Sequence, residues 1–134
     1  MIDSQTAPYG VAMLRVALGV MFLSHGLLNW LVFTLPGTAV FFASVGFPGW
    51  TAYPVTLLEI AGGAALLLGI YTRPLVAVLT LELLCAAKVH LANGWQFSNK
   101  DGGWEYPVFL AVACAVLALI GDGAFALKPA SNAD

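Results

Sequence analysis

Four long stretches of apolar residues, separated by short polar or glycine- and proline-rich segments, dominate the sequence. They cover about residues 8–35, 53–70, 74–92 and 104–120. Their apolar residues run on continuously instead of alternating with polar ones, which favours helices over strands. A helix of roughly 20 apolar residues is long enough to cross the hydrocarbon core of a bilayer. The pattern therefore predicts an all-α protein with four membrane spans.

Prolines and short connections support this division of the chain. A proline lies near the start of each stretch: Pro8, Pro54, Pro74 and Pro107. The first turn of a helix tolerates proline because its N–H groups have no partner within the helix. Connections as short as "YTR" (71–73) place consecutive helices antiparallel. We therefore expect a membrane-spanning antiparallel four-helix bundle, formed by one transmembrane domain of residues 1–134, with "PGTAVFFASVGFPGW" (36–50) as a loop.

Composition points to a lipid bilayer as the surrounding medium. Of the 134 residues, 60% are hydrophobic and 9% are charged, whereas soluble domains carry roughly 25% charged residues. So few charges do not cover the surface of a water-soluble protein. The net charge of −2 and the lack of a basic run exclude a nucleic-acid partner.

The cations predict an orientation in the membrane. Arg73 and Lys128 fall on the side of both chain ends, and Lys100 lies in the loop on the opposite side. Because cytoplasmic loops are enriched in lysine and arginine, we expect a multi-pass protein of a bacterial-type inner (plasma) membrane with both termini cytoplasmic. The first residues, "MIDSQTAP", lack the basic region and cleavage site of a signal peptide, so we expect the first stretch to be retained.

Several ionisable residues lie inside the apolar stretches, where they are rare and tend to pair. Arg15 lies roughly 10 Å and Glu82 roughly 12 Å from the end that carries the chain termini, at about 1.5 Å per helical residue. Their matching depth predicts a buried structural ion pair. Glu82 shares one face of its helix with Cys85, Ala86 and Val89, since successive residues are about 100° apart.

A second polar group gathers towards the other end of the bundle, its outer half. The candidate ligand-binding residues are His25, Asn29, Glu59, Lys88, His90 and Glu105. Convergence of titratable groups from four stretches indicates a functional site, with a polar packing network as the alternative. Lys88 is equally well interpreted as an interfacial anchor.

Three glycines near the polar group and the two cysteines also bear on how the helices pack. Gly26, Gly62 and Gly63 lie beside the polar group and allow close approach of helices. Cys85 and Cys114 do not form a C-x-x-C motif. We interpret them as small packing residues. The alternative, that they form a redox-active pair at similar depth in the membrane, is left open.

Taken together, these residues resemble those of the DoxX family of small integral membrane proteins over about residues 10–127. The resemblance is carried by Arg15 with Gly19 and Phe22, by "HG" (25–26), "FFASVGFP" (41–48), "LLEIAGGAALLLGIYTRP" (57–74), "HLANGW" (90–95), "GGWEYP" (102–107) and "GDGAFAL" (121–127). The family often has a lysine three residues after "HG". Here Asn29 stands at that position, so no role of that cation is carried over.

The resemblance implies a four-helix bundle and an association with redox systems, including a thiosulfate:quinone oxidoreductase. Our first hypothesis is an accessory or electron-transfer subunit with a quinone-type ligand bound in the outer polar site. Partners would then be other membrane or redox subunits, or a second copy in a homo-oligomer.

Two alternatives belong to other classes. One is a metal-binding membrane protein that uses His25, His90, Glu59 and Glu105 as ligands. The other is a non-enzymatic partner that assembles or stabilises membrane proteins. No nucleophile–base pair or phosphate-binding loop is present, and whether the protein is an enzyme is left undecided.

Overall fold

All regular elements in the described part of the chain, residues 3–129 of a computed structural model, are helices. In chain order they are α1 (Ala7–Leu27), a π-helical continuation (Leu28–Val32), α2 (Leu35–Ser44), a 3₁₀ turn (Gly49–Thr51), α3 (Ala52–Leu68), α4 (Thr72–His90), a 3₁₀ turn (Leu91–Asn93) and α5 (Glu105–Ile120). The prediction of an all-α protein is therefore confirmed.

Three helical stretches are long and apolar enough to cross a membrane: Ala7–Val32, Gly49–Leu68 and Thr72–Asn93. Each coincides with a predicted span, and together they indicate a multi-pass membrane protein. The fourth predicted span contains α5, an apolar helix of 16 residues. That is shorter than the roughly 20 residues that a bilayer requires, so a fourth crossing stays a prediction.

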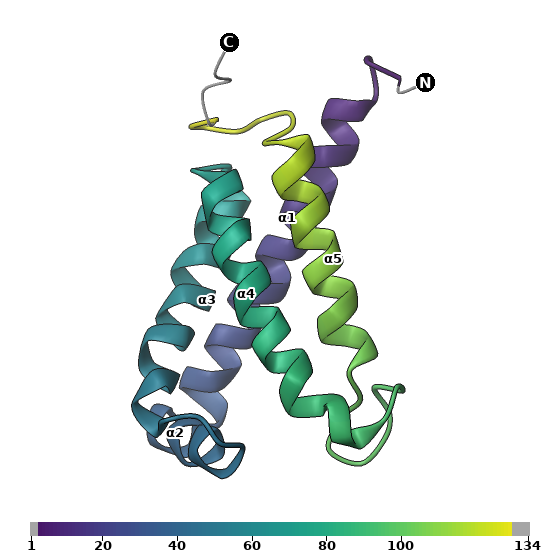
Figure 1. Cartoon of the computed structure of the whole chain (residues 1–134). Helices are drawn as coiled ribbons and strands as arrows, with labels where there is room; N and C mark the ends of the chain where they lie inside the picture. The colour runs from purple at the N-terminus through teal and green to yellow at the C-terminus, as the bar shows by residue number, and fades with distance from the viewer. Residues whose placement is uncertain (1–2, 130–134) are drawn as a thin grey trace.

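The long helices run along one axis of the molecule, each opposite in direction to the one before it (Figure 1). Both termini lie at one end, here named the terminal end, and α2 lies at the opposite, loop end. Helix α1 packs chiefly on α3, and α4 chiefly on α5. The buried core between the helices includes Leu18, Phe22, Leu66, Leu79, Leu110 and Leu117.

The segment 36–50 differs from the expected loop, because its first part forms α2. Thr34 accepts a hydrogen bond from the Gly37 N–H at 3.2 Å, which caps the new helix. Pro36 lies in the first turn, where its missing N–H does no harm. The sequence pattern did not reveal the helix, because a ten-residue helix in a proline- and glycine-flanked segment is too short to show a clear period.

Glycines bring α1 and α3 into close contact, as expected for Gly26 and Gly63. A Cβ atom on Gly63 would lie 2.5 Å from the backbone nitrogen of Leu23, and one on Gly26 would lie 2.9 Å from the backbone nitrogen of Ile60. Only hydrogen atoms fit at these positions. The glycine contact lets the backbones of α1 and α3 pack closely. It thereby sets the position of Glu59, which lies one turn before Gly63.

Arg15 does not use Glu82 as its hydrogen-bond partner, and this corrects the predicted ion pair. Its guanidinium group donates to the carbonyl oxygens of Leu66, Leu67, Asp122 and Ala124, at 2.7 to 3.2 Å. The side chain is 1% exposed. Leu66 and Leu67 lie in the last turn of α3, where the negative end of the helix dipole attracts a cation. The fixed fork of donors suits several carbonyls better than one carboxylate.

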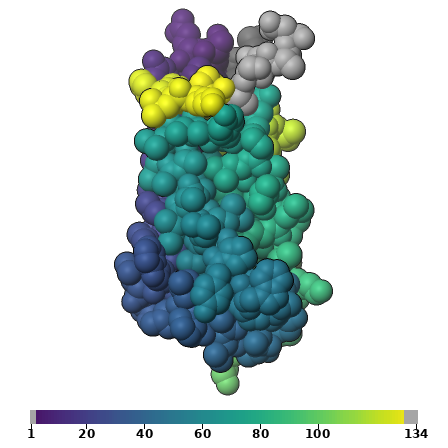
Figure 2. Space-filling view, turned by 90° about the vertical axis from the view of Figure 1, so that its left-hand side faces the viewer, coloured from purple at the N-terminus to yellow at the C-terminus, as the bar shows by residue number. Residues whose placement is uncertain are grey.

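The other two carbonyls belong to the segment that follows α5, which crosses the terminal end of the molecule (Figure 2). Its backbone N–H groups donate to Pro8 O from Ala124 and to Leu68 O from Leu127, at 2.9 and 3.0 Å. Arg15 therefore ties together the start of α1, the end of α3 and the segment after α5.

Candidate functional site

Two carboxyl groups lie next to each other inside the bundle. The side chains of Glu59 on α3 and Glu82 on α4 are close enough to interact electrostatically, and both border the same two cavities. Glu59 is buried, and Asn29 donates from Nδ2 to its Oε2 at 2.8 Å. We name Glu59 and Glu82 the carboxyl pair. Glu82, predicted to neutralise Arg15, is thus part of the polar site.

The π-helical turn at the end of α1 positions Asn29. A π-helical turn widens the helix and changes the direction of its side chains, and such turns are frequent at functional sites. Thr38 of α2 donates a hydrogen bond from its hydroxyl to the Asn29 carbonyl oxygen at 3.1 Å. The amide of Asn29 is therefore held towards Glu59.

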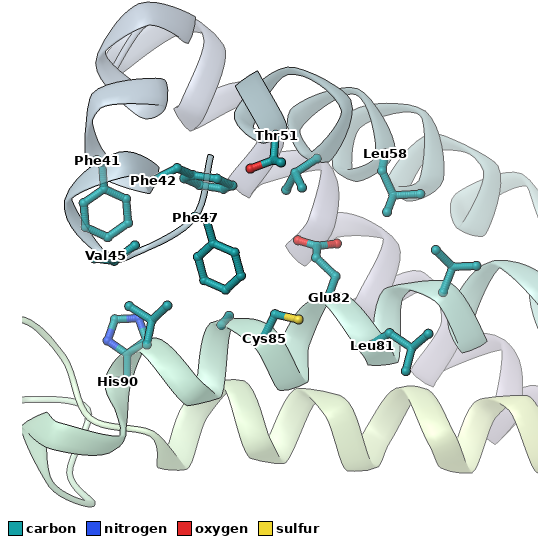
Figure 3. Close-up of a pocket in the computed structure, with 14 residues that line it drawn as sticks. Phe41, Phe42, Val45, Phe47, Thr51, Leu58, Leu81, Glu82, Cys85 and His90 are labelled. Carbon is teal, nitrogen blue, oxygen red and sulfur yellow. The ribbon is translucent and has the colours of Figure 1, made fainter. Parts of the chain in front are cut away.

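A cavity of about 370 Å³ opens between α2, α3 and α4 (Figure 3). We name it the aromatic pocket, since Phe41, Phe42 and Phe47 form one of its walls. Figure 3 shows these rings on the side of α2, facing the side chains of α4. Glu82 points into the pocket from α4, and His90 lies nearer the loop end.

The face of α4 that lines the aromatic pocket agrees with the helical spacing. Glu82, Cys85, Ala86 and Val89 all border the cavity. These are the residues that the sequence places on one side of the helix. The prediction that these four residues share one face of α4 is therefore confirmed. Across the cavity, this face lies opposite α2 and α3.

Two further cavities meet at the same carboxyl groups. One, of about 490 Å³, lies beside Asn29, Gly37 and Thr38. The other, of about 160 Å³, lies between α1, α4 and α5 and is bordered by His25, His90 and Tyr106. We name the latter the histidine cavity. Glu82 borders all three cavities and Glu59 borders two of them, so the carboxyl pair lies where they join.

His25 lies close to the carboxyl pair. Its Nδ1 atom is 2.8 Å from the carbonyl oxygen of Met21. Because a carbonyl oxygen only accepts, Nδ1 carries the proton, and Nε2 is the nitrogen free to accept one. The ring lies 6.3 Å from that of Tyr106, centroid to centroid.

His90 and Glu105 have different surroundings. His90 borders the aromatic pocket and the histidine cavity, and its Nδ1 contacts the Asp101 carbonyl oxygen at 3.0 Å. Glu105 accepts a hydrogen bond from the Phe97 N–H at 2.9 Å, which fastens the loop before α5. The structure therefore does not bring Glu105 to the carboxyl pair, because its carboxylate already caps that loop.

Lys88 is exposed and borders none of the three cavities described above. Its position opposite the pocket-facing side of α4 follows from the helical spacing. The interpretation as an interfacial anchor thus fits the structure better than a ligand-binding role.

The metal-binding alternative finds no support in the described residues. Among residues 3–129 there is no group of three or more histidine, cysteine, aspartate or glutamate side chains arranged to hold a metal ion. Of the four predicted ligands, Glu105 is engaged by the loop before α5.

The two cysteines are free and lie in different environments. Cys85 borders the aromatic pocket, with its sulfur visible there in Figure 3. Cys114 is fully buried among the leucines of the core.

The candidate residues from the sequence did not include Phe41, Phe42, Phe47 or Tyr106, which the structure places at the site. Phe41 and Phe42 lie on the helix that was expected to be a loop, so nothing in the pattern directed them towards α4. The run "FFASVGF" held one signal, a cluster of aromatic rings beside small residues. Aromatic clusters of this kind line many ligand sites.

Comparison with known proteins agrees with the geometry of a small membrane protein. The sequence model of the DoxX family matches residues 10–92. A protein of Bacillus subtilis (strain 168) named "Putative oxidoreductase CatD" is 33% identical over 120 residues, covering 90% of this chain and 85% of its own. An uncharacterised protein of Haemophilus influenzae is 30% identical over 126 residues, covering 90% and 89%. No solved structure matches the chain.

Proposed function

This chain belongs to the DoxX family of membrane proteins, and on that premise we propose that it is a redox-linked accessory subunit that binds a quinone-type ligand in the aromatic pocket. The observation that carries the proposal is an apolar cavity, walled by aromatic rings, that is bordered by Glu82, one member of the carboxyl pair.

The aromatic pocket suits a flat ring. Small-molecule sites typically have volumes of about 300–1,000 Å³, with apolar walls and few polar groups, and the pocket measures about 370 Å³. Phe42 and Phe47 provide ring faces against which a second ring can stack. Glu82 and His90 supply polar atoms at different positions along the wall, which suits a ligand with two carbonyl oxygens.

The carboxyl pair suits proton exchange. Two carboxyl groups that face each other away from water do not both ionise easily, so such pairs share a proton. Asn29 donates to Glu59 and favours its ionised form. Glu82 is then the member that carries the proton next to the pocket, and it donates to or accepts from a ligand there. When bound, a quinone supplies two-electron chemistry coupled to the uptake or release of two protons.

The Bacillus subtilis relative is named "Putative oxidoreductase CatD", which supports a redox-linked role. We assign the exchange of electrons to a partner redox protein, in line with an accessory subunit, and the exchange of protons to this chain. The aromatic pocket lies near the loop end, which under the orientation proposed below faces away from the cytoplasm.

Replacing Phe47 by alanine is expected to weaken the binding of a soluble quinone analogue by about tenfold, because a stacked ring contributes about 0.5–1.5 kcal/mol beyond its buried area. The measurement is equilibrium dialysis of decylubiquinone and of menadione against the purified protein in detergent. Phe109→Ala is the matched control, since Phe109 is 70% exposed on α5. It is expected to bind as the wild type does.

Absence of saturable binding by either quinone would contradict the proposal. Unchanged uptake of the quinones by both Phe47→Ala and Phe109→Ala would show partition into the detergent instead of a site. In either case the remaining hypothesis is a non-enzymatic assembly partner, whose polar residues serve packing alone.

We also propose that both termini face the cytoplasm of a bacterial inner membrane. Both termini lie at the terminal end, together with Arg73 and Lys128. Lys100 lies in the loop at the other end. Green fluorescent protein fused to the C-terminus is expected to fluoresce, and alkaline phosphatase inserted at Lys100 is expected to be active. The opposite pair of results would reverse the orientation and leave the helices unchanged.

A further inference from the structure

Glu82, one member of the carboxyl pair, borders two cavities of different character. On one side lies the aromatic pocket between α2, α3 and α4, whose walls are phenylalanine and aliphatic side chains. On the other side lies the histidine cavity between α1, α4 and α5, which carries most of the ionisable groups: His25, Glu59, Glu82, His90 and Tyr106. Glu82 borders both. A ligand on one side and proton traffic on the other therefore do not compete for space.

The histidine cavity has the size and the polar groups that ordered water requires. Its volume of about 160 Å³ would hold about five molecules, at about 30 Å³ each, and each buried water needs two to four polar partners. Carboxyl oxygens, imidazole nitrogens and a phenol hydroxyl are all on its wall. Since Tyr106 is 38% exposed, the cavity also lies close to the molecular surface.

His25 lies between the carboxyl pair and that surface. It is close enough to Glu59 to act on it electrostatically, and its ring lies against that of Tyr106. The hydrogen bond from Nδ1 to the Met21 carbonyl fixes the ring and leaves Nε2 as the proton acceptor. Imidazole is the side chain whose ordinary titration range lies nearest to neutral pH, so it takes up and releases a proton readily.

We propose, on the basis of the function proposed above, that protons reach and leave the carboxyl pair through the histidine cavity, with His25 as the relay. A proton leaves the Glu82 carboxyl group for water in the cavity, passes to Nε2 of His25, and leaves from there beside Tyr106. No electron moves in these steps, and each donor regains a proton from the opposite direction. His25 is thus a positioning and relay residue, not a group that touches the ligand.

The exchange of hydrogen for deuterium at the carboxyl pair tests this route directly. In the infrared spectrum of the purified protein, the carbonyl stretching band of a protonated carboxyl group is expected at neutral pH. Loss of this band in the variant Glu82→Gln would assign the band to the carboxyl group of Glu82. After transfer into heavy water the band shifts as its proton is replaced, and rapid-scan spectra give the rate.

His25→Phe keeps the ring and removes the relay nitrogen, and it is expected to slow the shift of the band by about a hundredfold, the usual contribution of a positioned acid–base group. Lys88→Gln is the matched control, a titratable side chain near the same end of the bundle that borders none of these cavities. It is expected to exchange at the wild-type rate. Melting temperatures of all variants show whether each is folded.

Three outcomes overturn the relay: no protonated carboxyl band at neutral pH, an unchanged rate in a folded His25→Phe, or a slower rate in His90→Phe alone. Quinone binding, measured on the same samples, separates this result from the proposed function. If a quinone binds and His25→Phe leaves the exchange rate unchanged, only the relay proposal is excluded. If the exchange rate depends on His25 but no quinone binds, the relay proposal stands and the quinone proposal is excluded.

Discussion

Replacing Arg15 by leucine is expected to lower the free energy of unfolding by about 3–5 kcal/mol, because four carbonyl oxygens lose a charged donor and a hydrogen bond to a charged group contributes about 1.5–3 kcal/mol. The carbonyls belong to Leu66, Leu67, Asp122 and Ala124. Some of them regain water at the terminal end, so the individual losses are not expected to add in full. Unfolding by sodium dodecyl sulfate in mixed micelles, followed by circular dichroism, measures the effect.

Arg15→Lys is the informative control. It keeps the positive charge near the end of α3, but one compact ammonium group does not reach carbonyls that lie in different directions around a planar guanidinium. An intermediate loss is therefore expected. The segment after α5 should also become accessible to proteases in Arg15→Leu, since two of the four lost hydrogen bonds hold it.

The double variant Arg15→Leu/Glu82→Leu decides between this network and the ion pair that depth alone predicts. With the carbonyl network, removing Glu82 does not restore the stability lost with Arg15. Recovery of a substantial part of that loss would mean that the two side chains pair after all.

Replacing Gly63 by alanine is expected to destabilise the protein by about 1–3 kcal/mol, whereas Gly62→Ala is expected to be neutral or slightly stabilising. The added Cβ on Gly63 would lie 2.5 Å from the backbone of Leu23, so α1 and α3 have to separate. The added Cβ on Gly62 meets the end of the Leu75 side chain at 3.2 Å, and that side chain can turn away.

The same denaturation experiment, run on the two variants in parallel, measures this difference. Both are glycine-to-alanine changes at neighbouring positions of one helix, so helix propensity is the same in each and cancels. Gly10→Ala, at a position with open space around it, gives the effect of propensity alone. Equal stability of the Gly62 and Gly63 variants would show that α1 and α3 do not approach as closely as described.

Both predictions bear on the candidate site. The contact at Gly26 and Gly63 sets how far Glu59 reaches towards α4, since Glu59 and Ile60 lie against Gly26, one turn before Gly63 on α3. Gly63→Ala is therefore also expected to disturb the carboxyl pair, which the infrared band assigned by Glu82→Gln would reveal.

The sequence by itself determined the four long helices, their order and the glycines at which helices approach closely. The reason is that lengths of apolar runs, prolines at helix starts and glycines one or two turns apart are local properties, which any fold of this chain must accommodate. The helical spacing likewise placed Glu82, Cys85, Ala86 and Val89 on one face, and that face does border a cavity. The candidates His25, Asn29 and Glu59 also lie together in the structure.

Only the tertiary structure decided which groups meet. Depth along a helix places Arg15 level with Glu82, but it does not say which way each helix is rotated, and rotation gave Arg15 the carbonyls of α3 and of the segment after α5. The same rotation put Glu82 beside Glu59. Glu105 does not lie at the site, because its carboxylate accepts a hydrogen bond from a loop N–H. Helix α2 forms one wall of the pocket, because a hydroxyl cap and packing stabilise a helix that is too short for its sequence pattern to show. Partner choice depends on rotation, loop path and the carbonyls left free at helix ends, and these are settled by packing of the whole chain.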